Sequence, residues 1–220
     1  MGTLSIVATP IGNLEDITLR ALRVLKECDV IYAEDTRVIS KLLAHYEIQK
    51  PLQRLDAAME GKRAGQIIER LEAGERVVYV SDAGTPGISD PGARLVAAVR
   101  VAGYRVDAIP GASALTAALS IAGLESDAFV FIGFLPHKKG RQTALKEIVA
   151  RDMPTVLYES PHRILKLLKE LETVGIECVS IGRELTKMHE EFIVGTPAEL
   201  AASLEKRGAV RGEFVVIVHR

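Results

Sequence analysis

One stretch of the chain has residue types that suit a small-molecule site. Residues 81–92 read Ser-Asp-Ala-Gly-Thr-Pro-Gly-Ile-Ser-Asp-Pro-Gly and directly follow the apolar run 77–80. The three glycines would expose backbone N–H groups, and Asp82 adds a carboxylate. Both would lie at the carboxyl edge of a parallel sheet, which is where open α/β sheets bind ligands. The stretch lacks the lysine of a Walker phosphate loop and the spacing of a dinucleotide fingerprint. A plain strand-to-helix turn, with glycines where φ must be positive, is the alternative.

Two further loops of the same kind follow apolar runs. Thr-Pro-Ile-Gly at 9–12 comes after residues 4–8, and Pro-Gly-Ala-Ser at 110–113 comes after residues 105–109. Right-handed crossovers between parallel strands would bring all three loops to one edge of one sheet. Three such loops around one crevice favour a small-molecule pocket over three unrelated turns.

The spacing of apolar residues predicts the elements that carry these loops. In the first half it predicts strands over 4–8, 30–33, near 52, over 77–80 and over 105–109, and helices over 18–27, 38–45, 60–73, 90–102 and 114–122. Asp90 and Pro91 suit a helix N-cap and the first helical position. Strands that alternate with helices predict a largely parallel sheet.

From about residue 125 the pattern changes. We predict strands over 129–134, 155–158, 178–183, 190–194 and 213–219, and helices over 142–150, 161–173 and 197–206. Consecutive strands without an intervening helix predict a mixed sheet. We therefore expect an α/β protein of two α/β domains, residues 1–118 and 119–220, with a ligand cleft between them.

Composition limits the classes of partner. The chain has 220 residues, ordinary globular composition and a net charge of −1, so an RNA site would have to be a local basic patch. The residues of such a patch are His137, Lys138, Lys139, Arg141, His162, Arg163 and Lys166. A solvated loop followed by a helix start is the alternative.

Nothing in the sequence suggests a metal, an export signal or a membrane span. Cys28 and Cys178 match no metal or redox spacing and suit buried thiols in a reducing cytosol. The N-terminus has no basic segment before a long apolar run, and no stretch is long enough to cross a bilayer. We expect a cytoplasmic protein.

Eight blocks, in order along the whole chain, resemble the bacterial ribosomal RNA small subunit methyltransferase I family of the tetrapyrrole-methylase-like superfamily. They are residues 7–14, 33–37, 81–92, 110–114, 131–136, 158–163, 183–187 and 212–214. By this resemblance, members usually continue past the position that matches Arg220 with a small C-terminal domain that could help to hold RNA, and this chain departs from that pattern.

The resemblance implies an enzyme that uses S-adenosyl-L-methionine to methylate the ribose 2′-hydroxyl of a cytidine in 16S rRNA near the decoding site. The substrate would be 16S rRNA or the small ribosomal subunit, and the enzyme would be a homodimer. The implied cofactor contacts in the first domain are Pro10, Asp82, Gly84, Thr85, Ser113 and Ala114. Those from the second domain, on the adenine side, are Tyr158, Glu159, Leu185 and Gly212.

A ribose hydroxyl is a weak nucleophile, so a general base or a nearby cation would assist methyl transfer. Glu184 and Lys187, which follow a strand in one of the resembling blocks, are the leading catalytic candidates. Asp35 and Arg37 come next. A surface ion pair is the alternative for the first two residues, and a helix cap is the alternative for the second two.

Two other functions stay open. A corrin or porphyrin precursor methylase would have the same fold, although such enzymes more typically have Gly-Asp-Pro where this chain has Ser81-Asp82-Ala83. A non-catalytic, regulatory module that binds S-adenosylmethionine or a nucleotide could keep the same loops. Methyl transfer to RNA would identify an RNA methyltransferase, and cofactor binding without turnover would favour the regulatory module.

Overall fold

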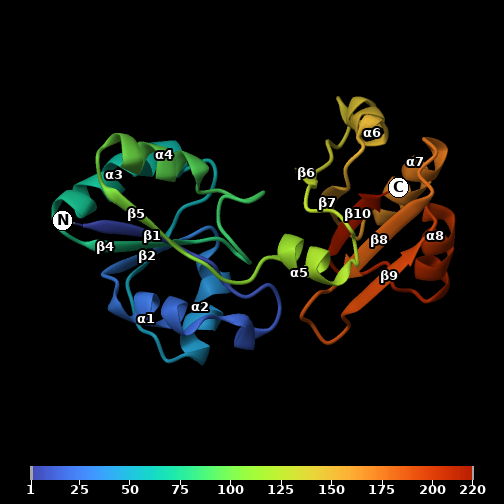
Figure 1. The fold of residues 1–220 in the computed structure, drawn as a ribbon. Coiled ribbons are helices and arrows are strands. Elements are labelled where there is room, and N and C mark those ends of the chain that lie inside the picture. The colour runs from blue at the N-terminus through green and yellow to red at the C-terminus, as the bar shows by residue number, and fades with distance from the viewer. Residues whose placement is uncertain (1, 220) are drawn as a thin grey trace. The chain divides into compact units, whose positions relative to one another are not determined.

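The computed structural model describes residues 2–219, which form two compact units. The first ends at Ser113 and the second begins at Ala114. The predicted boundary after residue 118 falls inside α5 (Ala114–Ile121), which lies against β10 (Phe214–His219) of the second unit (Figure 1).

The first unit is built on a five-stranded sheet in the order β3-β2-β4-β1-β5. All four pairings are parallel, so the prediction of a parallel sheet is confirmed. The strands are β1 (Thr3–Val7), β2 (Val30–Ala33), β3 (Leu52–Arg54), β4 (Arg76–Val80) and β5 (Arg105–Ile109).

Helices cover both faces of this sheet (Figure 1). On one face α1 (Leu19–Glu27) and α2 (Thr36–His45) pack on Val78 and Val80, and on the other α3 (Glu60–Glu72) and α4 (Ala93–Val101) pack on Val77 and Tyr79. Successive strand residues point to opposite faces, and both faces are buried here. This is why β4 reads as a continuous apolar run. A short 3-10 helix (Leu14–Asp16) precedes α1.

The predicted start of α4 is wrong. The helix begins at Ala93 after Gly92, not at Pro91, and Gly92 has a φ of 130°. A Cβ at Gly92 would lie 2.9 Å from Cε1 of Tyr79. The N-terminus of α4 is capped from another helix, because Oε1 of Glu60 accepts hydrogen bonds from the Gly92 N–H (2.6 Å) and, more weakly, from the Leu95 N–H (3.5 Å). A carboxylate at a helix N-terminus is favourable both as an acceptor and toward the helix dipole.

The second unit has a five-stranded sheet in the order β6-β7-β10-β8-β9. Its mixture of parallel and antiparallel pairs confirms the prediction of a mixed sheet. β6 and β7 are parallel and the other pairs are antiparallel. The strands not yet named are β6 (Val130–Phe134), β7 (Thr155–Glu159), β8 (Cys178–Arg183) and β9 (Glu191–Gly195). The helices are α6 (Arg141–Ala150), α7 (Ile164–Thr173) and α8 (Pro197–Lys206).

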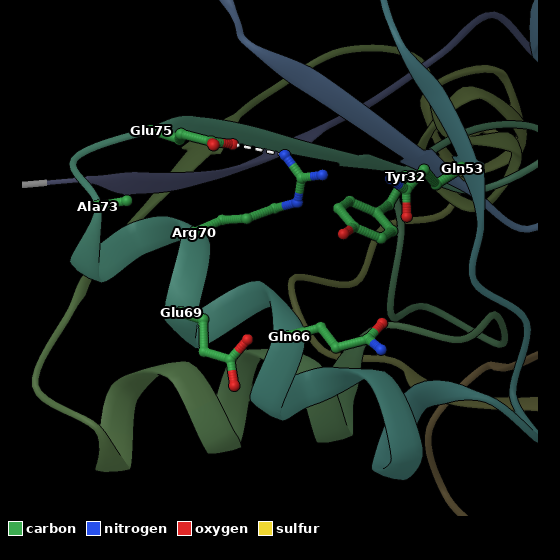
Figure 2. A pocket seen from close by; sticks show the side chains of 7 residues that line it. All are labelled: Tyr32, Gln53, Gln66, Glu69, Arg70, Ala73 and Glu75. Carbon is green, nitrogen blue, oxygen red and sulfur yellow. Dashed lines mark hydrogen bonds and ion pairs between the residues drawn. The ribbon is translucent and has the colours of Figure 1, made fainter.

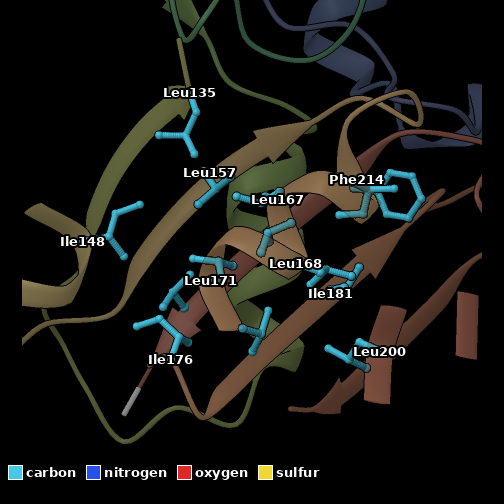
Figure 3. Packing of buried hydrophobic residues seen from close by; sticks show 14 of the residues in the cluster. Leu135, Ile148, Leu157, Leu167, Leu168, Leu171, Ile176, Ile181, Leu200 and Phe214 are labelled. Carbon is cyan, nitrogen blue, oxygen red and sulfur yellow. The ribbon is translucent and has the colours of Figure 1, made fainter. Parts of the chain in front are cut away.

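One predicted helix start in this unit is also wrong. α7 begins at Ile164 rather than Pro161, because residues 160–163 form a turn closed by a hydrogen bond from the Arg163 N–H to the Ser160 carbonyl (3.0 Å). The core of this unit is a cluster of buried aliphatic residues, completed by Phe214 (Figure 3). It includes Leu157 of β7, Leu168 of α7 and Leu200 of α8. This packing fixes where the ends of the strands lie within the unit.

No helix within residues 2–219 is both long and apolar enough to cross a membrane.

The cap on α4 can be tested by mutation. We expect Glu60→Ala to lower the free energy of unfolding by about 1.5–3 kcal/mol, because a buried charged acceptor and a helix cap are both lost. Glu60→Gln keeps an acceptor and should lose less. Urea unfolding measures both, with Glu69→Ala, an exposed position on the same helix, as the control. A Glu60→Ala protein as stable as the control would contradict the capping role.

Candidate functional site

The loops after β1 and β4 are joined by a two-residue backbone bridge. The Thr9 N–H donates to the Gly84 carbonyl (2.9 Å), and the Gly84 N–H donates to the Thr9 carbonyl (3.0 Å). Gly84 has a φ of +74°, a conformation that favours glycine. Thr9 is buried, and its hydroxyl oxygen has no hydrogen-bond partner among the residues that the structure describes. The bridge therefore fixes both loops and leaves one buried polar atom for a further partner.

The loop after β5 joins the same edge. The Thr85 hydroxyl donates to the Ala112 carbonyl (3.3 Å), and a Cβ added to Gly84 would lie 3.6 Å from that same oxygen. Pro10 and Ser113, both half-buried, belong to the loops that this contact and the bridge hold. The structure therefore brings together the three loops that the sequence singled out, by contacts that involve Gly84 and Thr85.

Asp82 links this edge to the end of β2. Its Oδ1 accepts a hydrogen bond from the Asp35 N–H (2.9 Å). Asp35 itself accepts from the Arg37 N–H (2.9 Å) and forms an ion pair with the exposed Arg37 guanidinium. Hydrogen bonds from Arg37 lower the pKa of Asp35 to about 2. Asp35 is thus the N-cap residue of α2, and Arg37 pairs with it. A helix cap was the alternative to a catalytic role that the sequence allowed for these two residues.

Acidic groups gather at this edge beyond those predicted. Burial is the main cause that raises the pKa of Asp90 to about 6; the Asp82 charge adds to this rise and a hydrogen bond with Ser81 opposes it. The pKa of Glu34 is raised by burial and then by Asp82 and Asp90. Neither Glu34 nor Asp90 was a predicted site residue, although both lie within the motifs at residues 33–37 and 81–92. Mutual repulsion of these carboxylates favours a cationic ligand group.

In the second unit Lys187 lies between two carboxylates. Its Nζ is 2.8 Å from Glu184 Oε1 and 2.8 Å from Glu213 Oε2. Glu184 Oε1 also accepts from the Glu213 N–H (3.0 Å). Glu213 was not a predicted site residue, although it lies in the motif at residues 212–214. The predicted Glu184–Lys187 pair is thus part of a cluster of three charges.

Backbone strain surrounds this cluster. Glu184 has a φ of 49°, Thr186 of 67° and Gly212 of 100°. A Cβ at Gly212 would lie 2.6 Å from Cδ of Glu184, so only glycine fits there. Leu185 is buried, so its side chain belongs to the interior of the unit. Strained residues of this kind often cluster at functional sites.

The charge cluster also changes the proton affinities of its members. Burial alone would raise the pKa of Glu184, but hydrogen bonds from Lys187 and from the Glu213 backbone outweigh it and lower that pKa. Burial alone would lower the pKa of Lys187, but the bonds to Glu184 and Glu213 raise it. At neutral pH the site therefore holds an ionised carboxylate beside a protonated amine.

Glu159 is fully buried and bound to two arginines. Its Oε1 accepts from the Ser160 N–H (2.8 Å) and lies 2.7 Å from Arg163 Nε, and its Oε2 lies 3.7 Å from Arg141 Nη2. Arg141 also pairs with Glu170 (2.8 Å). The Glu159 carboxylate therefore pairs with buried groups of its own unit.

This network changes the predicted basic patch. Arg141 is only 3% exposed and lies outside the exposed surface in which the sequence placed it. Arg163 is partly buried, with its Nε on Glu159. His137, Lys138 and Lys139 are exposed, so they form the accessible basic segment of the loop after β6.

A hollow of about 450 Å³ lies elsewhere in the first unit, between α3 and strands β2 and β3 (Figure 2). Its lining residues are Tyr32, Gln53, Gln66, Glu69, Arg70, Ala73 and Glu75. Its one cation, Arg70, pairs with Glu75 at 2.7 Å. None of these residues was a predicted site residue. None of them belongs to the loops after β1, β4 and β5, which we call the interlocked loops.

Within residues 2–219 no group of His, Cys, Asp and Glu side chains is arranged to hold a metal ion.

The raised pKa of Asp90 makes stability depend on pH. A carboxyl group whose pKa is higher in the folded state stabilises the fold below its ordinary pKa near 3.8, and this contribution is lost as the pH rises through about 6. Asp90→Asn removes the titration, so its melting temperature relative to wild type should rise by about 2–4 °C between pH 4 and pH 7. Thermal unfolding across this range measures it, with the exposed Asp127→Asn as the control. A difference in melting temperature between Asp90→Asn and wild type that stays constant with pH would contradict the burial of Asp90.

The family model described as Tetrapyrrole (Corrin/Porphyrin) Methylases matches residues 3–201. Among solved structures, a cobalt precorrin-4 methyltransferase of cobalamin biosynthesis has a TM-score of 0.71 at 20% identity, covering 99% of this chain and 94% of that one. A diphthine synthase has a TM-score of 0.74 at 17% identity, covering 99% and 90%. At these identities the two structures establish the fold alone.

Curated relatives are much more similar. The chain is 46% identical to the ribosomal RNA small subunit methyltransferase I of Borrelia garinii subsp. bavariensis and 46% identical to that of Thermotoga maritima, in each case over 99% of this chain and 98% of the relative. It is 47% identical to the protein of that name from Xylella fastidiosa, over 99% of this chain and 81% of the relative. The chain therefore belongs to the tetrapyrrole methylase family and, within it, to the ribosomal RNA small subunit methyltransferase I group.

Proposed function

We propose that this chain transfers a methyl group from S-adenosylmethionine to the 2′-hydroxyl of a cytidine in 16S rRNA. The observation that carries the proposal is the full-length similarity, at 46% identity, to relatives named ribosomal RNA small subunit methyltransferase I. The proposed enzyme acts in the cytoplasm, as a homodimer, on 16S rRNA or the small ribosomal subunit. The target cytidine lies near the decoding site of that RNA.

The loop edge of the first unit has the chemistry that this cofactor needs. S-adenosylmethionine supplies an electrophilic methyl group on a sulfonium, and it also carries a cationic amine. The acidic groups Glu34, Asp82 and Asp90 complement these positive charges, and the unpartnered Thr9 hydroxyl can bond a polar atom of the ligand. We assign the cofactor contacts of this edge to Pro10, Asp82, Gly84, Thr85 and Ser113. Ala114, which directly follows Ser113 and begins the second unit, is the last residue of this set.

In the second unit the proposed cofactor contacts are Tyr158, Glu159, Leu185 and Gly212. Because the side chains of Glu159 and Leu185 are buried, these two residues would contact the ligand through their backbone. Gly212 leaves space beside Glu184 that any side chain would fill.

Glu184 and Lys187 are the proposed catalytic residues. Both bonds of the Glu184 carboxylate to Lys187 and Glu213 use Oε1, so Oε2 can accept the hydrogen of the ribose hydroxyl. The Lys187 amine, held protonated by two carboxylates, stabilises negative charge as it develops on the ribose oxygen. In this scheme the pair orients and polarises the nucleophile, and Asp35 and Arg37 remain secondary candidates.

The activity is tested by methyl transfer from radiolabelled S-adenosylmethionine to small ribosomal subunits that lack their native methylations, followed by nucleoside analysis. We expect 2′-O-methylcytidine. Glu184→Gln and Lys187→Met should each lower kcat by about 10²–10⁴-fold with unchanged cofactor affinity, while Lys206→Met, an exposed lysine, should not. Labelling of a corrin or porphyrin precursor in place of RNA would contradict the proposal. Cofactor binding without any turnover would indicate a regulatory module.

The exposed lysines after β6 are proposed to contact RNA phosphates. We expect the double variant Lys138→Glu with Lys139→Glu to bind RNA more weakly and to reduce the slope of log K against log salt by about 1–2, because phosphate contacts release counterions. Cofactor affinity should stay unchanged. Lys62→Glu with Lys206→Glu, the same charge reversal at exposed positions elsewhere, is the control. An unaltered salt slope would rule out these contacts.

A further inference from the structure

Three aromatic rings gather at the end of β6 and β7. The ring of Tyr158 lies 5.0 Å from that of Phe131 and 5.7 Å from that of Phe134, both in edge-to-face geometry. Phe131 and Phe134 are three residues apart, so a regular strand would point them to opposite faces. The pairing of β6 with β7 shifts register between them, and Gly133 there has a φ of +63°. This bulge brings both rings against Tyr158.

Phe134 nevertheless stays open to solvent. It is 51% exposed although the ring of Tyr158 packs against it. The loop that begins directly after it carries the exposed His137, Lys138 and Lys139. An exposed ring beside a cationic loop is the combination with which proteins bind single-stranded nucleic acid.

Buried charges hold this surface in place. Arg163 donates from Nη1 to the Leu135 carbonyl (3.1 Å), and Arg141 donates from Nη1 to the Pro136 carbonyl (3.2 Å). Both guanidinium groups are anchored by Glu159. The guanidinium carbon of Arg163 also lies 5.9 Å from the centre of the Phe134 ring, a cation–π distance. The backbone that joins the exposed ring to the lysines is therefore fixed before any ligand binds.

We propose that Phe134 is a stacking platform for an unpaired RNA base, with Tyr158 and Arg163 supporting the ring and Lys138 and Lys139 contacting the flanking phosphates. The inference rests on the proposed RNA substrate and adds to it the residue that holds a base. RNA is the occupant that the charges favour, because the phosphates that flank an unpaired base are complementary to the two lysines. Sequence-specific proteins commonly hold unstacked RNA bases on aromatic rings in this way.

The test compares Phe134→Ala with Phe134→Trp in the full chain. The probes are a short fluorescein-labelled single-stranded RNA and the same RNA with abasic nucleotides. Phe134→Ala should raise the Kd for the first RNA about 5- to 150-fold, since one base–aromatic stack is worth about 1–3 kcal/mol. Its salt slope should not change, because the ring has no charge. Phe134→Trp should bind as wild type does, and Phe129→Ala, an exposed phenylalanine outside the ring cluster, is the matched control.

The outcomes separate this inference from the proposed function. If wild type methylates small ribosomal subunits and Phe134→Ala has an unchanged Kd and KM for RNA, the platform is wrong and the methyltransferase proposal stands. If wild type binds the abasic RNA as tightly as the unmodified RNA, the platform is also wrong. A Phe134→Ala protein whose oligomeric state changes in sedimentation while its RNA affinity does not would assign the ring to an interface between copies. If wild type neither binds nor methylates RNA, both proposals fall.

Discussion

The two hydrogen bonds between Thr9 and Gly84 are the contact on which the first unit's candidate site depends. Parallel strands alone bring loops to one edge of a sheet, but they do not fix one loop against another. This bridge does so for the loops after β1 and β4, and it requires the positive φ of Gly84. Thr85 then reaches the loop after β5, and Asp82 reaches the end of β2. A ligand would thus meet backbone that is already ordered, which lowers the entropic cost of binding.

The second unit positions its loops by charge rather than by backbone pairing. Lys187 is shared by Glu184 and Glu213, and Glu159 anchors two arginines that hold the loop after β6. Removing one partner from a buried ion pair leaves an uncompensated charge and is costly. The loops that carry the exposed lysines and the ring of Phe134 are therefore tied to the interior of the unit. Both units use buried contacts to support surfaces that remain open.

The sequence predicted what local periodicity determines. The parallel and mixed sheets followed from apolar runs and from whether helices separated them, and the three glycine loops were placed at one edge by topology alone. Failures came where distant residues decide the outcome. Asp90 and Pro91 resemble a helix start, yet α4 begins later because Glu60, far away in the chain, caps it at Gly92. Arg141 sits in a run of basic residues, but a partner on α7, Glu170, draws it into the interior. No local sequence pattern indicates partners that are this far away in the chain.

We propose that the interlocked loops of the first unit bind S-adenosylmethionine. Mapping of backbone amide chemical shifts by NMR during a titration with this cofactor tests it directly. We expect saturable shifts at the amides of Thr9, Gly84, Thr85 and Ala112. Shifts confined to the hollow around Tyr32, Arg70 and Glu75, or no saturable shifts at the four loop amides, would contradict it.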